Sequence, residues 1–325
     1  MNSSKTLVVL LGPTAVGKTD LSLELAKLWS CPIISADSRQ IYKGIPIGTA
    51  SPTERELKLV KHYFVNTLEL ESYYSAALYE KDSLEVLTRT FTQNDKAILS
   101  GGSMMYIDAL CKGIDDIPTV RDNIREEMQL RYKQEGLESL CKQLEQLDPY
   151  YYAQMDSQNP KRVIHALEIC LQTGVPYSSF RKNNFKKRPF NIVKIGLYRK
   201  RSILFDRINQ RVDQMMANGL LEEVQRVYPL RHLNSLNTVG YKELFEVISG
   251  HWPLDMAIER IKKNTRVYAK KQMTWFKKDP DVFWINLDEN PQDKVVEVIT
   301  SILSLSHLNK DEATIQRDLY RLKVW

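Results

Sequence analysis

The sequence predicts an α/β fold in which a parallel sheet is flanked by helices and interrupted by a helical insertion. Over the first hundred residues, apolar runs alternate with amphipathic helical patterns, which is typical of strand and helix units in a parallel sheet. Between residues 119 and 190 the strand patterns disappear, and Glu, Gln, Lys and Leu dominate. The run Asn191–Tyr198 then restores a strand. We therefore expect a core made from residues 1–118 and 191–325, with residues 119–190 inserted as a helical domain.

The individual elements of the core follow from short apolar runs and from helical spacing. Leu21, Leu25 and Leu28 share one face of a helix after the first strand, because residues three or four apart lie on the same side of a helix. Long amphipathic helices are predicted in the second half, and a polar helical tail at the C-terminus. The expected strands are Thr6–Leu11, Cys31–Ala36, Ala97–Ser100, Asn191–Tyr198 and Val282–Leu287, and the expected helices include Ala76–Phe91, Ser202–Met216 and Leu254–Lys278.

Composition narrows the classes of function. The chain has 325 residues, of which 43% are hydrophobic and 26% charged, as in ordinary globular proteins. No apolar run approaches the ~20 residues of a membrane span, and the N-terminal apolar run is too short for a signal peptide, so we expect a cytoplasmic protein. Its four cysteines form no CxxC pair, which argues against a zinc ribbon or a disulfide framework. A net charge of +6 permits a polyanionic partner.

A phosphate-binding loop follows the first predicted strand and opens a helix. In this context the pattern GxxxxGK[ST] predicts a P-loop, whose backbone N–H groups and helix N-terminus bind a diphosphate or triphosphate. Lys18 is expected to reach the phosphate oxygens, and Thr19 to ligate Mg²⁺. The core is therefore expected to resemble P-loop NTPases, although the motif alone does not distinguish hydrolysis from group transfer. Its residues are Gly12, Pro13, Thr14, Ala15, Val16, Gly17, Lys18 and Thr19.

A carboxylate follows the second predicted strand. Asp37 comes directly after Cys31–Ala36, at the edge where parallel sheets bind their ligands. There it could ligate a metal-bound water or accept a proton from a substrate nitrogen. The alternative from position alone is a residue that caps a helix or a turn.

Several motifs together resemble one family. GPTAVGKT, SADSRQIYKGIPIGTA, the YSA at Tyr74, GGSMMY from Gly101, NPKRVIHALEI, VGYKEL and YAKKQMTWFKKD occur in this order. In order and spacing they are similar to the tRNA dimethylallyltransferase (isopentenyltransferase) family, over about residues 5 to 285. Taken one at a time, only the P-loop and the DSxQ stretch that begins at Asp37 would indicate this family.

The resemblance implies a reaction and roles for particular residues. Relatives transfer a dimethylallyl group from dimethylallyl diphosphate to N6 of adenosine 37, next to the anticodon of a tRNA, and release diphosphate. The P-loop would then hold the diphosphate of the donor rather than ATP, with Mg²⁺ assisting. By this likeness Asp37 is the base near N6, Lys18 and Arg211 stabilise the diphosphate, and the hydroxyl of Ser103 contacts substrate. Arg207, one helical turn before Arg211, is the second choice for the diphosphate.

The same resemblance implies how tRNA is bound. Asp37 and Ser103 would touch the target nucleotide, and further contacts would come from Ser38, Arg39, Gln40, Arg121, Lys161, Arg162, Val163, Ile164 and His165. At three positions this sequence departs from the family pattern, which affects the assignment of tRNA-binding roles to its residues. His165 and Lys271 stand where arginine is usual, and Met104 replaces a small residue. Since lysine lacks the planar fork of arginine, Lys271 could alter affinity or substrate choice.

Basic residues elsewhere in the chain also predict RNA contacts. Five cations share a surface of the predicted helix between residues 259 and 278, namely Lys262, Lys263, Arg266, Lys270 and Lys277. A second basic segment spans residues 181–188. Each is expected to contact RNA phosphates, with a solvated helix face or a charged hinge loop as the alternative.

Two other classes of protein fit part of this sequence. A nucleotide or small-molecule kinase would also have a P-loop and would bind ATP, but it does not require the DSxQ stretch. An RNA-binding P-loop protein without activity would have no use for Asp37. Isoprenoid synthases are disfavoured because the sequence has no DDxxD motif. Nothing in the sequence calls for a dimer, and we expect a monomer.

Overall fold

The structure is a computed structural model that describes residues 5–182, 185–290 and 292–305. The predicted C-terminal helical tail and Asn183 and Asn184 of the second basic segment lie outside these residues. The described chain divides into two compact units, Lys112–Lys187 and the remainder. Each unit has its own hydrophobic core.

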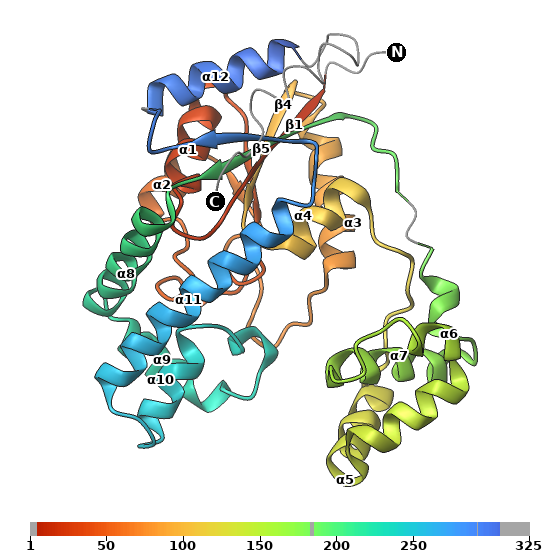
Figure 1. The fold of residues 1–325 in the computed structure, drawn as a ribbon. Coiled ribbons are helices and arrows are strands. Elements are labelled where there is room, and N and C mark those ends of the chain that lie inside the picture. The colour runs from red at the N-terminus through yellow and green to blue at the C-terminus, as the bar shows by residue number, and fades with distance from the viewer. Residues whose placement is uncertain (1–4, 183–184, 291, 306–325) are drawn as a thin grey trace. The chain divides into compact units, whose positions relative to one another are not determined.

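The larger unit contains a six-stranded parallel sheet with the order β3-β2-β4-β1-β5-β6. Its central strand β1 pairs with β4 on one side and β5 on the other, as Figure 1 shows. The predicted α/β fold is confirmed. The strands are β1 (Thr6–Leu11), β2 (Ile33–Ala36), β3 (His62–Tyr63), β4 (Lys96–Gly101), β5 (Asn191–Tyr198) and β6 (Val282–Asn286).

Helices cover both faces of this sheet, as expected for parallel strands whose side chains are buried on both sides. On one face Leu25 of α1, Leu204 of α8 and Ile299 of α12 share a core cluster with alternate residues of β1. On the other face Tyr79 of α3, Leu110 of α4 and Phe276 of α11 pack together. These helices are α1 (Lys18–Leu28), α3 (Ala76–Thr90), α4 (Met104–Lys112), α8 (Arg201–Ala217), α11 (Leu254–Phe276) and α12 (Gln292–Leu305).

A further cluster lies beyond the sheet, where α9 (Leu220–Val227), α10 (Tyr241–Ile248) and the first turns of α11 pack together. Ile41 and Ile45, from the segment after β2, are buried in this cluster. The helix α2 (Glu54–Leu59) follows, and it begins with a capping box at Thr53 and Glu56. The segment between β2 and α2 is therefore anchored on the second half of the chain.

The smaller unit is helical. The long helical run α5 (Asp122–Leu147) is interrupted at Gly136, whose φ of 78° and ψ of 176° lie outside the helical region. It packs against α6 (Pro149–Tyr152) and α7 (Pro160–Thr173). The buried carboxylate of Asp148 accepts hydrogen bonds from the backbone N–H groups of Tyr151 and Ser178, which joins α6 to the turn after α7. The sequence assigned this insertion to residues 119–190, and the compact unit spans 112–187.

Candidate active site

The P-loop connects β1 to α1 at the carboxyl edge of the sheet. Gly12 has a φ of 148°, and a Cβ at this position would lie 2.6 Å from the carbonyl oxygen of Leu197, so only glycine fits. Lys18 is half-buried and folds back on the loop, where its Nζ donates to the carbonyl oxygens of Gly12 and Pro13 at 2.9 and 2.8 Å. Burial, with a smaller effect of Arg211, lowers the pKa of Lys18 to about 7. An arriving anion would offset both effects by stabilising the ammonium.

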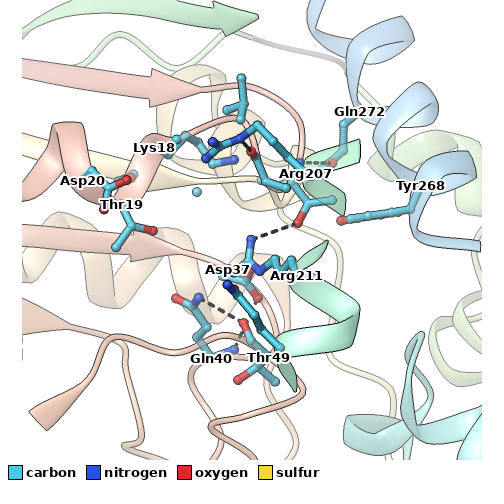
Figure 2. A pocket seen from close by; sticks show the side chains of 18 of the residues that line it. Lys18, Thr19, Asp20, Asp37, Gln40, Thr49, Arg207, Arg211, Tyr268 and Gln272 are labelled. Carbon is cyan, nitrogen blue, oxygen red and sulfur yellow. Dashed lines mark hydrogen bonds between the residues drawn. The ribbon is translucent and has the colours of Figure 1, made fainter. Parts of the chain in front are cut away.

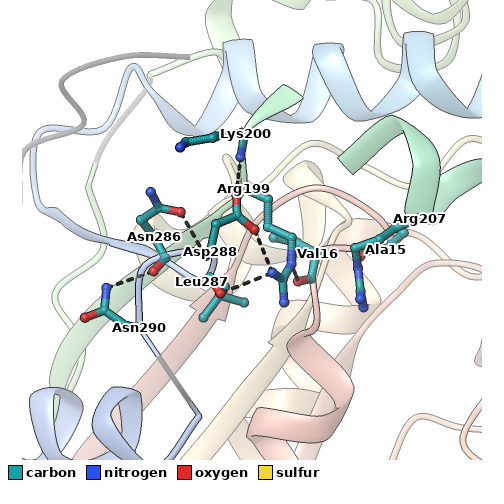
Figure 3. A network of polar contacts seen from close by, with 9 residues as sticks. All are labelled: Ala15, Val16, Arg199, Lys200, Arg207, Asn286, Leu287, Asp288 and Asn290. Carbon is teal, nitrogen blue, oxygen red and sulfur yellow. Dashed lines mark hydrogen bonds and ion pairs between the residues drawn. The ribbon is translucent and has the colours of Figure 1, made fainter. Parts of the chain in front are cut away.

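Side chains from later parts of the chain hold the backbone of this loop. Gln272 of α11 accepts a hydrogen bond from the N–H of Thr14 at 2.9 Å, and its amide donates to the carbonyl of Gly102 at 2.8 Å. Arg207 of α8 donates from Nε to the carbonyl of Ala15, and Arg199, after β5, donates from Nε to the carbonyl of Val16 (Figure 3). The loop is thus fixed by contacts that the sequence motif does not reveal.

A cavity of about 510 Å³ opens over the P-loop. Lys18, Arg207 and Arg211 line it together with residues 14–17 of the loop, so three cationic side chains and a helix N-terminus converge on one space. Figure 2 shows Arg207 and Arg211 extending from α8 toward the loop. Such an arrangement is suited to a diphosphate or triphosphate.

Asp37 lies in the wall of the same cavity, directly after β2. Because β1 and β2 run parallel in one sheet, their carboxyl ends place the P-loop and Asp37 at the same edge. The Oδ1 atom of Asp37 accepts hydrogen bonds from the N–H groups of Arg39 and Gln40 at 2.8 and 3.3 Å. Its Oδ2 atom has no such bond among the described residues and is available to a substrate.

A second cavity, of about 460 Å³, adjoins the first. The two share Thr14, Asp37, Thr49, Arg211 and Tyr268 in their walls. The second is lined by many apolar side chains, including Met104, Met105, Ile208, Val212, Met215, Leu220, Val239 and Ile261. Asp37 therefore lies where a cationic space meets an apolar one.

Tyr268 of α11 belongs to both cavities. Burial, and then the negative charge of Asp37, raise the pKa of its phenol to about 12, so the hydroxyl stays protonated and can donate a hydrogen bond. The close-up view shows its ring directed toward the space between the P-loop and Asp37 (Figure 2).

The residues after Asp37 hold protein segments. Arg39 donates to the carbonyl oxygens of Asn234 and Ser235 at 2.8 and 3.1 Å. Gln40 lines the cationic cavity, and its Nε2 donates to the carbonyls of Thr49 and Ala50. Arg39 and Gln40 thus line the cavities and also hold neighbouring backbone segments in place.

A buried carboxylate supports the other end of the segment that Gln40 holds. Glu223 of α9 is 0% exposed. Its two oxygens accept from the N–H groups of Ile47 and Gly48, each at 2.8 Å, and from the hydroxyl of Tyr241 at 2.6 Å. Sequence reasoning did not single out this residue. The sequence around a glutamate on an amphipathic helix does not indicate which backbone N–H groups its carboxylate will bind.

The remaining residues predicted near the reaction each line one or both cavities. Ser38 and Ser103 line it, and the N–H of Ser103 donates to the carbonyl of Ala36 at 3.0 Å. Arg211 is directed to both cavities, and one of its Nη atoms lies 3.5 Å from the hydroxyl of Thr14. Thr19 lines the cationic cavity.

The predicted tRNA contacts of the insertion lie on the helical unit. Lys161, Arg162 and His165 are exposed on α7, and Arg121 is exposed just before α5. Val163 and Ile164 are buried in the core of this unit. Their side chains support the helix on which the three exposed residues stand.

The predicted basic face of α11 is partly covered by α8. Lys262 pairs with Asp213 of α8 at 2.8 Å, Arg266 donates to the side chain of Asn209, and Lys270 lies over the ring of Phe205. These three cations therefore bind α8, while Lys263 and Lys277 are exposed. Helical spacing could not separate the two groups because α8 packs along the helix at that surface.

Together the fold and the site define a P-loop α/β protein that can hold a diphosphate against a carboxylate. The family model described as IPP transferase matches residues 40–279. The chain belongs to the IPP transferase family.

Relatives with high identity cover most of the chain. A protein of Parabacteroides distasonis named tRNA dimethylallyltransferase 2 is 58% identical over 289 residues, which is 89% of this chain and 96% of the relative. A protein of Phocaeicola vulgatus named tRNA dimethylallyltransferase 1 is also 58% identical, over 297 residues, or 91% of this chain and 98% of the relative.

Solved structures resemble the described fold. A tRNA isopentenylpyrophosphate transferase from Bacillus halodurans aligns with a TM-score of 0.69 and 32% identity, over 97% of this chain and 99% of that one. A eukaryotic dimethylallyltransferase acting on tRNA aligns with a TM-score of 0.78, over 96% of this chain and 86% of that one. At 24% identity the latter supports the fold alone. Among the described residues, no helix has the length and hydropathy to cross a lipid bilayer.

Proposed function

We propose that this protein transfers the dimethylallyl group of dimethylallyl diphosphate to N6 of adenosine 37 in tRNA and releases diphosphate. One observation carries the proposal: Asp37 shares a cavity wall with the P-loop, Lys18 and Arg211. A departing diphosphate and an incoming base nitrogen can therefore meet in one space. The relatives named tRNA dimethylallyltransferase support the same reaction.

The cationic cavity would bind the donor by its diphosphate. As the bond between the allylic carbon and the diphosphate oxygen breaks, negative charge grows on the leaving group. Lys18, Arg207 and Arg211, which line this cavity, together with the N–H groups of the loop, are positioned to stabilise that charge in the transition state. Lys18 would first exchange its contacts with Gly12 and Pro13 for contacts with phosphate oxygens.

Asp37 would accept the proton of the nucleophile. The new bond forms between N6 and the allylic carbon, and the proton that N6 loses passes to the carboxylate. The free Oδ2 atom is suited to this step, because Oδ1 is held by two backbone N–H groups. The apolar cavity beside Asp37 would accommodate the dimethylallyl group and the base next to it, with Ser103 supplying a hydroxyl.

Mg²⁺ is expected with the donor. Proteins usually hold this ion through one or two side-chain oxygens together with substrate phosphates and water. Thr19, in the wall of the cationic cavity, offers a suitable hydroxyl. When bound, the ion would neutralise charge on the diphosphate.

The exposed cations of the helical unit are proposed to contact tRNA. Arg121, Lys161, Arg162 and His165 offer charged or titratable groups for phosphates, and Arg39, Gln40 and Ser38 border the space where the base would enter. A tRNA substrate implies work in the cytoplasm. We expect the protein to act as a monomer, which size-exclusion chromatography with light scattering would test.

A direct assay tests the proposed reaction. The protein is incubated with Mg²⁺, dimethylallyl diphosphate and unmodified tRNA. The RNA is then digested, and the masses of its fragments are measured by mass spectrometry. We expect one added dimethylallyl group on adenosine 37, and no effect of ATP as the only donor. A kinase, the alternative from sequence, would instead consume ATP without the allylic donor; the family and its named relatives do not support that alternative.

A further inference from the structure

Arg199 holds the P-loop from outside the diphosphate cavity. Its Nε donates to the carbonyl of Val16 at 2.9 Å, and its Nη1 donates to the carbonyl of Leu287 at 3.1 Å and to Oδ1 of Asp288 at 2.8 Å (Figure 3). Neither Arg199 nor Asp288 is in the wall of the cavity. The contact with Val16 is therefore made behind the loop.

This contact fixes the direction of a peptide group in the loop. The C=O of Val16 and the N–H of Gly17 belong to one planar trans peptide and point in opposite directions. With the carbonyl held by Arg199, the N–H of Gly17 faces the other way, and Gly17 is in the wall of the cavity. Gly17 has no side chain to restrain this peptide, and its φ of 118° lies in the region that favours glycine. The orientation of the peptide therefore depends on what binds the carbonyl.

Asp288 connects the loop to the helix that carries the diphosphate-facing arginines. While Oδ1 accepts from Arg199, Oδ2 accepts from the backbone N–H of Lys200. Lys200 is the N-cap residue of α8, and α8 supplies Arg207 and Arg211 to the cavity. One carboxylate thus fixes both the P-loop, through Arg199, and the N-cap residue of α8.

The loop that carries Asp288 is itself braced. The N–H of Asp288 donates to Oδ1 of Asn286 at 3.0 Å, Asn290 donates to the carbonyl of Asn286 at 2.9 Å, and the N–H of Leu287 donates to the carbonyl of Tyr198 at 3.0 Å. The Asp288 side chain is 7% exposed and that of Arg199 is 18% exposed. Solvent therefore screens this ion pair little.

We propose that Asp288 and Arg199 are positioning residues that preform the diphosphate-binding shape of the P-loop. Their effect falls on the binding of the donor and leaves the binding of tRNA unchanged. This inference rests on the proposed function for the identity of the donor, but not for the binding of a diphosphate.

The expected effect is large enough to measure. Hydrogen bonds to charged groups contribute about 1.5 to 3 kcal/mol each, and a factor of ten in affinity corresponds to about 1.4 kcal/mol. Asp288→Asn keeps an acceptor for Lys200 but removes the charge opposite Arg199. We expect it to weaken diphosphate binding about tenfold to a hundredfold.

The test compares two variants that each remove a buried ion pair. Lys194 and Asp279 lie 2.7 Å apart with side chains 10% and 14% exposed, and they join β5 to the end of α11 without touching the P-loop. For Asp288→Asn and Asp279→Asn, calorimetry measures Kd for inorganic diphosphate with Mg²⁺. Steady-state assays measure KM for dimethylallyl diphosphate and for tRNA, and thermal unfolding gives Tm. We expect both variants to lower Tm, but only Asp288→Asn to raise Kd and the donor KM, with the tRNA KM unchanged.

A second pair of measurements tests the route through Arg199. Arg199→Met and the double variant Arg199→Met with Asp288→Asn should weaken diphosphate binding by about the same factor, because both residues act through one contact. If Asp288→Asn fails to fold, Arg199→Lys keeps a charge near Asp288 but cannot reach Val16, Leu287 and Asp288 together, and it should also weaken binding.

Several outcomes would overturn the inference. They are an unchanged diphosphate Kd in Asp288→Asn or Arg199→Lys, an equal loss in Asp279→Asn, or additive effects of Arg199→Met and Asp288→Asn. A wild-type protein that binds diphosphate but transfers no dimethylallyl group would overturn the proposed function and leave this inference standing.

Discussion

The Oε1 atom of Gln272 lies 2.9 Å from the backbone nitrogen of Thr14, so α11 holds the P-loop by an amide some 258 residues away in the chain. The same side chain donates to the carbonyl of Gly102, and a Cβ on Gly102 would lie 2.3 Å from its Nε2. Gln272 therefore explains the glycine at position 102 and joins the end of β4 to the loop.

Replacing Gln272 by Ala should destabilise the protein and weaken donor binding. The side chain is 2% exposed, and its loss leaves the part-buried N–H of Thr14 and the buried C=O of Gly102 without this partner. We expect the free energy of unfolding to fall by about 2 to 5 kcal/mol, measured by urea denaturation. Gln225→Ala, at an exposed position on α9, serves as the control. A Gln272→Ala protein as stable as the wild type would contradict this account of the contact.

Asp37→Asn should strongly slow transfer and preserve donor binding. The amide oxygen can still accept from the N–H groups of Arg39 and Gln40, so the turn is retained, but the general base is lost. General base catalysis contributes about 10²- to 10⁴-fold. We therefore expect the rate constant of transfer, measured in single-turnover assays, to fall by that factor. The Kd of inorganic diphosphate should change little. Wild-type turnover by this variant would rule out a base at this position.

Lys18→Ala should slow the chemical step. The ammonium is expected to stabilise the diphosphate most strongly as the allylic bond breaks, and one such contact contributes several kcal/mol to the barrier. Both kcat and kcat/KM for the donor should therefore fall about 10²- to 10³-fold. Lys27→Ala, at an exposed position in the last turn of the same helix, is the control and should match the wild type. Equal kinetics for the two variants would remove Lys18 from the reaction.

Arg162→Ala should reduce the salt dependence of tRNA binding. Each phosphate contact contributes about 0.7 to 0.9 to the slope of log K against log salt concentration. Arg162 is exposed on α7, and its removal should lower the slope by about that amount without changing the Kd of diphosphate. The comparison is Arg55→Ala, at an exposed position on α2 of the other unit. Identical slopes for both variants and the wild type would argue that Arg162 contacts no phosphate.

Cys31 gives a pH dependence of labelling and stability. Burial raises the pKa of its thiol to about 11, against 9.0 for the ordinary group. At pH 8 the thiolate fraction should therefore be about 100-fold lower than in the unfolded chain, and native protein should resist iodoacetamide at this residue. Peptide mass spectrometry before and after denaturation tests this.

The sign of the stability effect at Cys31 follows from the raised pKa. The unfolded thiol ionises near pH 9 and the folded thiol near 11, so the folded chain binds more protons in between. The contribution of Cys31 is complete below pH 9 and is lost as the pH rises through 11. Cys31→Ala should remove this loss from the profile of unfolding free energy. A wild-type profile parallel to that of Cys31→Ala would contradict the raised pKa.

Much of the fold could be predicted because its longer strands are mostly apolar. Thr6–Leu11 and Asn191–Tyr198 were predicted with the bounds of β1 and β5. The edge strand β3 was missed because two half-buried residues, His62 and Tyr63, carry no periodicity. The short helices α9 and α10 were also missed, since their apolar faces are completed by each other and by the segment after β2.

The site was predicted in part for a similar reason. A P-loop and an aspartate after a strand can be recognised because local sequence fixes where they lie on a sheet. The supports of the loop could not be recognised, because Arg199, Gln272 and Asp288 reach it across the fold. Sequence gives the type of a side chain, and only packing decides whether it meets substrate or backbone, as with Lys262 and Asp213.

The dependence of the P-loop on late residues has a consequence for synthesis on the ribosome. Residues 12–19 are made first, but Arg199, Arg207 and Gln272, which hold their backbone, emerge only after most of the chain. The edge of β1 that pairs with β5 also stays unpaired until β5 has been synthesised. We therefore expect a nascent or prematurely terminated chain to bind diphosphate more weakly than the complete protein, because residues 199, 207 and 272 are not yet in place to hold the loop.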